Sequence, residues 1–133
     1  MSTELLVLFY LGVMTFVLVF IQGMQVPLNF GFKWGLGNRD EPREPTAFMG
    51  RIARTIDNQI QALTMAVPVL AALILFPEAQ SSTTQTGAWL LLFGRLGFAV
   101  SYLVGIPYLR SLIWGVGLFG WMMLSYGFIV AML

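Results

Sequence analysis

Cysteine and histidine are both absent from this chain of 133 residues. Without cysteine it has no disulfide framework and no thiol nucleophile of its own. Without histidine it lacks the commonest general base and the commonest metal ligand of proteins, so we expect no metal site. Any reactive group used in catalysis would therefore have to arrive with a bound ligand.

Charged residues are scarce, at 10% of the chain, whereas soluble domains carry about 25%. Hydrophobic residues make up 58%, and the mean hydropathy is +0.81. This composition predicts an integral membrane protein surrounded by membrane lipids. The net charge of +1 gives no general attraction to nucleic acid, so we expect no nucleic-acid partner.

Four long apolar segments follow one another along the chain. About 20 helical residues cross the hydrocarbon core of a bilayer, so each segment is long enough for one crossing. We expect a single all-α domain over residues 1–133, a bundle of four transmembrane helices spanning about 3–26, 47–76, 85–104 and 107–131. Thr46 is expected to cap the second helix, Pro68 to kink it, and Pro107 to lie in the first turn of the fourth.

The first segment could instead be a secretory signal peptide. Its start, Met-Ser-Thr-Glu, has no basic residue, and no small-residue cleavage site follows the apolar stretch. We therefore favour a spanning helix.

The basic residues lie almost entirely on one side of the predicted bundle. Residues 27–46 form the only long polar segment, a predicted loop, and basic residues cluster there, at the start of the second helix and at the start of the fourth: Lys33, Arg39, Arg43, Arg51, Arg54 and Arg110. By the positive-inside rule this face is cytoplasmic and both termini point outward.

A polar stripe leads from this basic side into the second span. Arg51, Arg54, Asn58 and Gln61 are spaced i, i+3, i+7 and i+10, so they share one helical face. Unpaired polar groups in lipid cost several kcal/mol, so the stripe needs partners, and an anion rich in acceptors would suit it. Asp57 is the only acid nearby, and we expect it to pair with Arg54.

The third and fourth spans carry further polar groups at membrane depth. Arg95 lies mid-span, where insertion costs about 2.5–3.5 kcal/mol, and Tyr102 is on the same helical face seven residues later. Arg110 and Ser111 open the fourth helix. Each arginine alone could simply snorkel to the interface. Together with the stripe they predict a basic pocket at the cytoplasmic half of the bundle, open to a polar anion from water and an apolar molecule from lipid.

These motifs resemble the MAPEG family, the membrane-associated proteins of eicosanoid and glutathione metabolism. The family's second helix carries Arg-x-x-Arg-x-x-x-Asn-x-x-Glu, which here reads Arg51-x-x-Arg54-x-x-x-Asn58-x-x-Gln61. Arg95, Tyr102 and Arg110-Ser111 resemble the third-to-fourth helix region of one branch. The resemblance covers the four-span layout and the chain length as well, and it points to a bacterial-type member in an inner membrane.

The resemblance implies a homotrimer that binds glutathione as cosubstrate between neighbouring subunits. By position, Arg51, Arg54, Asn58 and Gln61 would hold its carboxylates and amides, and Arg95 and Tyr102 would line the same pocket. Arg110 would stand at the glutathione sulfur, with Ser111 beside it. A guanidinium there would lower the thiol pKa from about 8.5 toward neutrality.

The resemblance therefore predicts an enzyme, a glutathione transferase or peroxidase for lipophilic electrophiles or hydroperoxides. Gln61 departs from the family's Glu, and that change removes a carboxylate able to receive the ligand's amino group. Two other functions fit the residues. The arginines could bind anionic lipid or a partner helix without catalysis, or the bundle could be a small exporter, which the lack of a deep Asp or Glu disfavours.

Overall fold

The computed structural model describes residues 1–133, and its regular structure is entirely helical. Four helices are long and apolar enough to cross a membrane, which confirms the all-α class and the presence of four candidate spans. The elements in chain order are α1 (Thr3–Phe30), α2 (Phe32–Leu36), α3 (Ala47–Leu75), the 3₁₀ turn η1 (Pro77–Ala79), α4 (Ser82–Val104) and α5 (Leu109–Met132).

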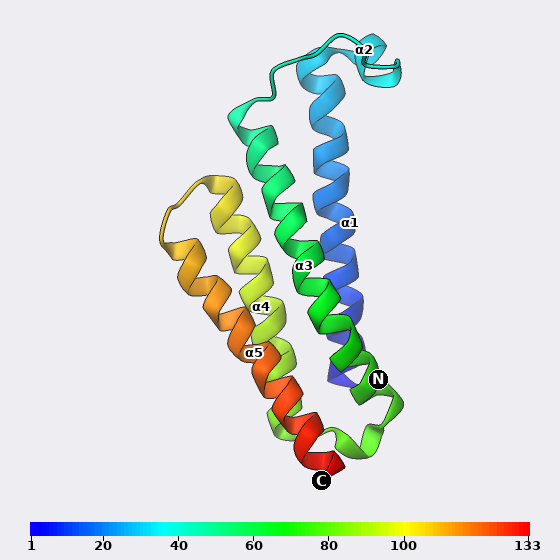
Figure 1. Cartoon of the computed structure of the whole chain (residues 1–133), viewed down its shortest axis with the longest axis vertical. Helices are drawn as coiled ribbons and strands as arrows, with labels where there is room; N and C mark the ends of the chain where they lie inside the picture. The colour runs from blue at the N-terminus through cyan, green and yellow to red at the C-terminus, as the bar shows by residue number, and fades with distance from the viewer.

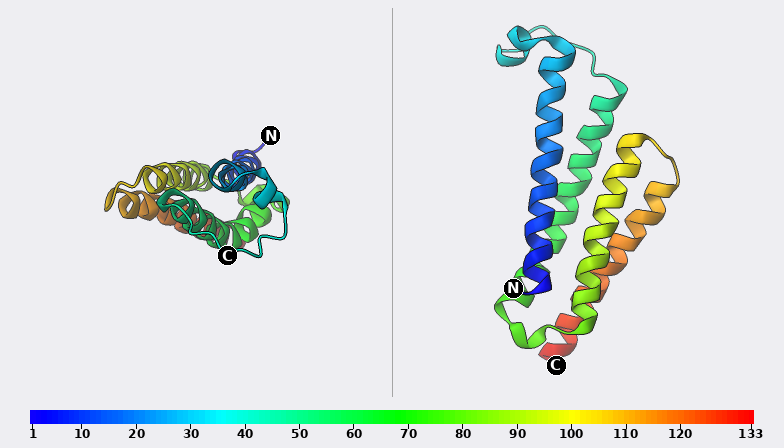
Figure 2. Two further views of the ribbon diagram at one scale, coloured as in Figure 1. Left: turned by 90° about the horizontal axis from the view of Figure 1, so that it is seen from above. Right: turned by 180° about the vertical axis from the view of Figure 1, so that it is seen from behind.

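The long helices form two antiparallel pairs that lie side by side. α1 packs mainly against α3, and α4 packs mainly against α5 (Figure 1). Both termini lie at one end of the bundle, whereas α2 and the α4–α5 turn lie at the other end (Figure 2). This arrangement places the basic ends of α3 and α5 at the same end of the molecule.

Three helix boundaries differ by two or more residues from the sequence-based prediction: the end of α1 and the starts of α4 and α5. α1 continues through Pro27 to Phe30 and ends at Gly31, whose φ of 82° is a conformation that glycine adopts without strain. α5 begins at Leu109, so Pro107 lies in the preceding turn and not in the first helical turn. The reason is Tyr108, whose φ of 64° cannot belong to a right-handed helix.

Side-chain caps are present at three helix starts, at Ser2 for α1, Thr46 for α3 and Ser81 for α4. The Thr46 hydroxyl accepts a hydrogen bond from the Met49 N–H, as expected for a cap of α3. Ser81 and Thr84 form a reciprocal capping box, so α4 begins at Ser82, three residues before the start predicted from hydropathy. The α3 helix runs through Pro68 without interruption.

α4 and α5 approach closely because glycines face each other across their contact. A Cβ added at Gly120 would meet the Gly87 carbonyl oxygen at 2.6 Å and would also collide with the Leu91 backbone nitrogen. A Cβ added at Gly94 would meet the Gly117 Cα at 2.5 Å. Small residues such as glycine let the two helix backbones approach closely. Close packing matters here because lipid, unlike water, does not drive apolar helices together.

Buried apolar side chains form two clusters at different depths. The larger lies toward the termini and contains residues from all four long helices, among them Leu11, Leu70 and Leu124. The smaller, Leu18, Ile52, Ile56 and Ala99, lies toward the α2 end. Polar side chains on α1, α3 and α4 are buried as well, and they are described below.

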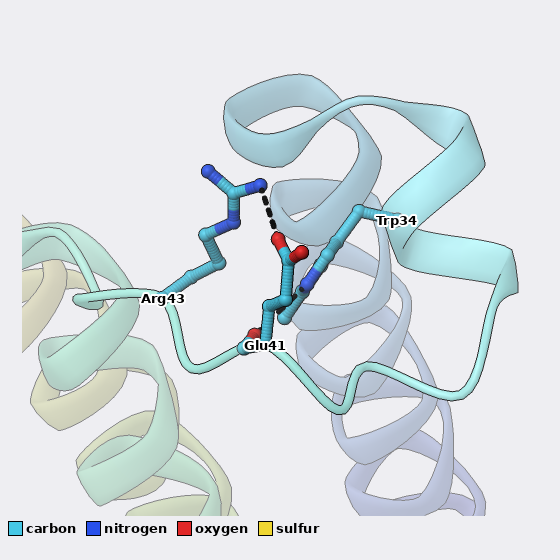
Figure 3. Close-up of polar contacts among 3 residues, drawn as sticks. All are labelled: Trp34, Glu41 and Arg43. Atoms are coloured by element: carbon cyan, nitrogen blue, oxygen red, sulfur yellow. Dashed lines mark hydrogen bonds and ion pairs between the residues drawn. The ribbon is translucent and has the colours of Figure 1, made fainter.

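The polar loop after α2 is tied down by two contacts (Figure 3). The Trp34 indole N–H donates to the Glu41 carbonyl oxygen at 3.0 Å. The Arg43 guanidinium pairs with the Glu41 carboxylate at 3.4 Å, and this is the only ion pair in the chain. An exposed ion pair of this kind adds little stability, so we interpret it as a local contact within the loop and not as part of a functional site.

Candidate functional site

Tyr102, near the end of α4, is the centre of a cluster of cations. The Arg54 Nε–H, from α3, donates to the Tyr102 hydroxyl oxygen at 3.0 Å. The Arg110 guanidinium, from the start of α5, lies over the Tyr102 ring with its carbon 4.6 Å from the ring centroid. A cation over an aromatic face is attracted by the ring quadrupole. One aromatic side chain therefore holds guanidiniums from two other helices.

Arg51 is held at the same place by the end of α4. Its Nε–H donates to the Leu103 carbonyl oxygen at 3.1 Å, one of the last carbonyls of that helix, which have no intrahelical partner. An arginine is a suitable donor there because the C-terminal end of a helix carries partial negative charge. In both Arg51 and Arg54 the Nε makes the internal bond, which leaves the terminal Nη atoms for a ligand.

These side chains line a pocket of about 280 Å³ at the α2 end of the bundle. No acidic residue lines it, so its charge is strongly positive. Such a pocket can bind carboxylate or phosphate groups through bidentate guanidinium contacts. The lining residues are Ala47, Arg51, Arg54, Tyr102, Gly105, Ile106, Pro107 and Arg110.

Arg95 lies outside this pocket, deeper in the bundle and only 3% exposed. Its Nε–H donates to Gln59 Oε1 at 3.0 Å and its Nη1 donates to Asn58 Oδ1 at 2.8 Å. The guanidinium also lies on the Phe98 ring, 4.8 Å from its centroid. Asn58 belongs to the polar stripe on α3, so its hydrogen bond links Arg95 to the helix that carries Arg51 and Arg54.

Gln59 is a polar residue of this site that the sequence analysis missed. It is fully buried, accepts from Arg95 and donates from Nε2 to Thr15 Oγ1 of α1 at 3.2 Å. Thr15 in turn donates to the Leu11 carbonyl at 2.8 Å. A chain of hydrogen bonds therefore joins α4, α3 and α1. The sequence does carry a signal for this network: Thr15, Gln59 and Arg95 are all polar residues at membrane depth, where each needs a hydrogen-bond partner.

Replacing Gln59 with leucine should destabilise the protein by about 2–3 kcal/mol, because the Arg95 Nε–H would be left buried without an acceptor. The free energy of unfolding, measured by denaturant titration in detergent micelles, tests this. Gln61→Leu is the matched control: Gln61 is exposed on the same helix, so its replacement should change stability by less than about 0.5 kcal/mol. Equal effects of the two substitutions would contradict the network.

The remaining residues of the predicted site are not drawn into the pocket of the single chain. Gln61 and Ser111 are exposed, and neither lines it. Asp57 is exposed too, and the expected pairing with Arg54 is wrong, since Arg54 bonds Tyr102 instead. The structure therefore brings together Arg51, Arg54, Tyr102 and Arg110, links Asn58 to Arg95, and leaves Gln61 and Ser111 apart.

Comparison with known proteins agrees with this arrangement of motifs and helices. The model of the MAPEG family matches residues 7–130, nearly the whole chain. No curated protein and no solved structure matches it. The family resemblance seen in the motifs is confirmed: the chain belongs to the MAPEG family, membrane proteins that include glutathione transferases and peroxidases.

Proposed function

We propose that this protein is a membrane-embedded glutathione transferase or peroxidase acting on lipophilic electrophiles or hydroperoxides. The observation that carries the proposal is the pocket lined by three guanidiniums and by Tyr102, which contacts two of them, with no acid in the lining. Glutathione has two carboxylates and two amide groups, so it offers the negative charge and the acceptors that such a pocket requires.

Arg51 and Arg54 are proposed to bind the carboxylates of glutathione through their free Nη atoms. Asn58 is proposed to donate its amide N–H to the peptide, because its Oδ1 already accepts from Arg95. Arg95 would then act on the ligand by orienting Asn58. Gln61, exposed on the same face of α3, is proposed to complete the contacts in place of the family's Glu.

Arg110 is proposed to stabilise the glutathione thiolate, with Ser111 next to it in sequence as a supporting hydroxyl. A nearby cation favours the charged form of the thiol and lowers its pKa. In a transferase reaction the thiolate sulfur bonds to the electrophilic carbon and the leaving group departs with its electron pair. In a peroxidase reaction two glutathiones become a disulfide while the hydroperoxide is reduced to an alcohol and water.

The lipophilic substrate is proposed to approach through the bilayer along a groove between α1 and α4. This groove has a volume of about 610 Å³ and is lined only by hydrophobic side chains. It includes Leu103, whose carbonyl binds Arg51 of the polar pocket, so the apolar and polar sites meet at the end of α4.

A homotrimer is part of the proposal because the pocket of one chain is small. At about 280 Å³ it falls just below the range of about 300–1,000 Å³ usual for ligand sites. A neighbouring subunit would enlarge and cover it, and would bring further polar groups to residues such as Gln61 and Ser111. The proposed topology places this end in the cytoplasm of a bacterium, where glutathione would enter from water.

Glutathione should raise the melting temperature of the purified protein, and so should its analogue with alanine in place of cysteine. Both ligands carry the carboxylates that the arginines bind, whereas the thiol contributes to turnover and not to anchoring. A ligand at 100 times its Kd would add about 2.7 kcal/mol of stability, which is a shift of several degrees. Thermal melts in detergent across a ligand series measure this effect.

Arg54→Ala should abolish the shift, while Arg43→Ala should preserve it. The two substitutions remove the same charge, but Arg43 lies on the outer loop away from the pocket. If neither ligand shifts the wild-type protein while anionic phospholipid copurifies with it, the non-catalytic lipid-binding function replaces this one.

A further inference from the structure

Arg39, in the loop between α2 and α3, lines two adjoining cavities at once. One is a polar cavity of about 640 Å³ within the loop, lined also by Lys33 and Asn38. The other is a groove of about 510 Å³ between α1 and α3, and most of its surface is apolar. No other residue lines both cavities. A cation therefore lies where a polar space meets an apolar one.

The Arg39 side chain is held by its own loop but keeps part of its guanidinium free. Its Nε–H and an Nη2–H donate to the Gly35 carbonyl oxygen at 2.9 and 2.7 Å, and its guanidinium carbon lies 5.8 Å from the centroid of the Trp34 ring. Nη1 has no hydrogen-bond partner in the chain, and the residue is exposed. The oriented guanidinium thus has donors left for an anion that approaches from outside.

The apolar groove extends from the loop along α1 toward the centre of that helix. Val26, Gly23 and Val19 form one wall and share a face of α1. Val26 and Val19 are two helical turns apart, which is about 10 Å along the axis. Met49 and Ala53, one turn apart on α3, belong to the other wall. A hydrocarbon chain lying parallel to the helices fits a groove of this form.

The loop end of the groove lies at the level of the lipid headgroups. Phe30 and Trp34 contact each other edge to face there, with ring centroids 5.1 Å apart. Aromatic residues of this kind mark the membrane–water interface, and basic residues at that level bind lipid headgroups. The groove itself continues to the depth of the acyl chains.

The charges of the polar cavity complement a phosphate. Its cations are Lys33, Arg39 and Arg43, and its acids are Asp40 and Glu41. Glu41 pairs with Arg43, which leaves Lys33 and Arg39 against Asp40 alone. The remaining charge is therefore positive, and it attracts an anionic group.

We propose that the two cavities together bind one glycerophospholipid from the leaflet at the α2 end of the bundle. Arg39 binds its phosphate, the polar cavity holds the rest of the headgroup, and an acyl chain lies in the groove between α1 and α3. A soluble anion would use only the polar part, and a lipid without phosphate only the apolar part. The site shares no residue with the pocket around Tyr102, so it does not depend on the proposed glutathione activity.

Native mass spectrometry of the detergent-solubilised protein tests the proposal. Titration with phosphatidylglycerol or phosphatidylethanolamine should show one saturable lipid per chain. Diacylglycerol has the same acyl chains but no phosphate, so it should bind at least about tenfold more weakly.

Two substitutions of the same charge test the phosphate contact. Arg39→Asn removes the cation, and asparagine tolerates the φ of 59° at this position, so the loop keeps its conformation. Its affinity for phospholipid should fall at least about tenfold. Arg54→Asn removes an arginine at the same end of the bundle, from the pocket around Tyr102, and should keep the wild-type affinity.

Two glycine substitutions on α1 test the acyl groove. A Cβ at Gly23 or at Gly12 would meet nothing within 4 Å, so neither position is closed to a side chain. Gly23 lines the groove and Gly12 does not. Gly23→Leu should therefore lower the affinity for phospholipid about tenfold, whereas Gly12→Leu should leave it unchanged.

Equal affinities for phospholipid and diacylglycerol would overturn the proposal, and so would wild-type phospholipid affinity in Arg39→Asn and Gly23→Leu. Lipid that is lost from Arg54→Asn but kept by Arg39→Asn would place the lipid in the pocket around Tyr102 and would overturn it as well. A helix of a second copy of the chain found in the groove would also refute it. Glutathione binding is measured separately by thermal shift, so this proposal and the proposed function can fail independently.

Discussion

Replacing Arg110 with alanine should lower kcat/KM for glutathione conjugation about 10²- to 10³-fold. Losses of this size are typical when one group that stabilises negative charge is removed from an active site. Arg110 lies on the Tyr102 ring and is the only arginine of the pocket contributed by α5. No cysteine or histidine in the chain could replace it as an activator of the thiol. Detergent-solubilised protein with glutathione and a chlorodinitrobenzene-type electrophile provides the assay.

The pattern of kinetic constants distinguishes this role from simple anchoring. Most of the loss should appear in kcat, because Arg51 and Arg54 would still hold the carboxylates and keep KM within a few-fold of wild type. Glu78→Ala, at the opposite end of the bundle in η1, should leave the rate unchanged. A wild-type rate in the Arg110 variant would refute the assignment of the thiolate to this arginine.

The largest effect on stability is expected for Gly120→Ala. An added Cβ would collide with the Leu91 backbone nitrogen and the Gly87 carbonyl oxygen. Backbone cannot move aside as a flexible side chain can, so α4 and α5 would have to separate, at a cost of about 3 kcal/mol or more. Unfolding in mixed detergent micelles, followed by circular dichroism, measures the change.

Gly115→Ala is the matched control on the same helix. A Cβ at Gly115 would meet nothing within 4 Å, and alanine is the better helix former. Its stability should therefore stay at the wild-type value or rise slightly. If both glycine variants unfold alike, the close contact between α4 and α5 is not what holds this pair together.

Hydropathy and capping residues predicted most of the fold, because both are local properties. The four apolar runs became four long helices, and Thr46 caps α3 as expected. The prediction was wrong where local signals compete. The sequence predicts a loop from Pro27, yet Pro27 lies in the last turn of α1. It also predicts Pro107 in the first turn of the fourth span, yet α5 begins only after Tyr108.

The candidate site was predictable only as a set of residues on helical faces. The common face of Arg51, Arg54 and Asn58 follows from the helical period, and so does that of Arg95 and Tyr102. The helical period does not predict the hydrogen-bond partner of each side chain. Arg54 bonds Tyr102 and not Asp57, and Arg95 bonds Asn58 and the unforeseen Gln59.

The amino-acid sequence by itself determined that this is a four-helix membrane protein with a basic end, no thiol of its own and MAPEG motifs, because these depend on composition and on spacing within single helices. Only the tertiary structure decided that Arg51, Arg54 and Arg110 line one pocket with Tyr102, while Arg95 lies deeper and bonds Asn58 and Gln59. The depth and rotation of each helix are set by packing between helices, above all by the glycine contact of α4 with α5, and no single segment contains that information.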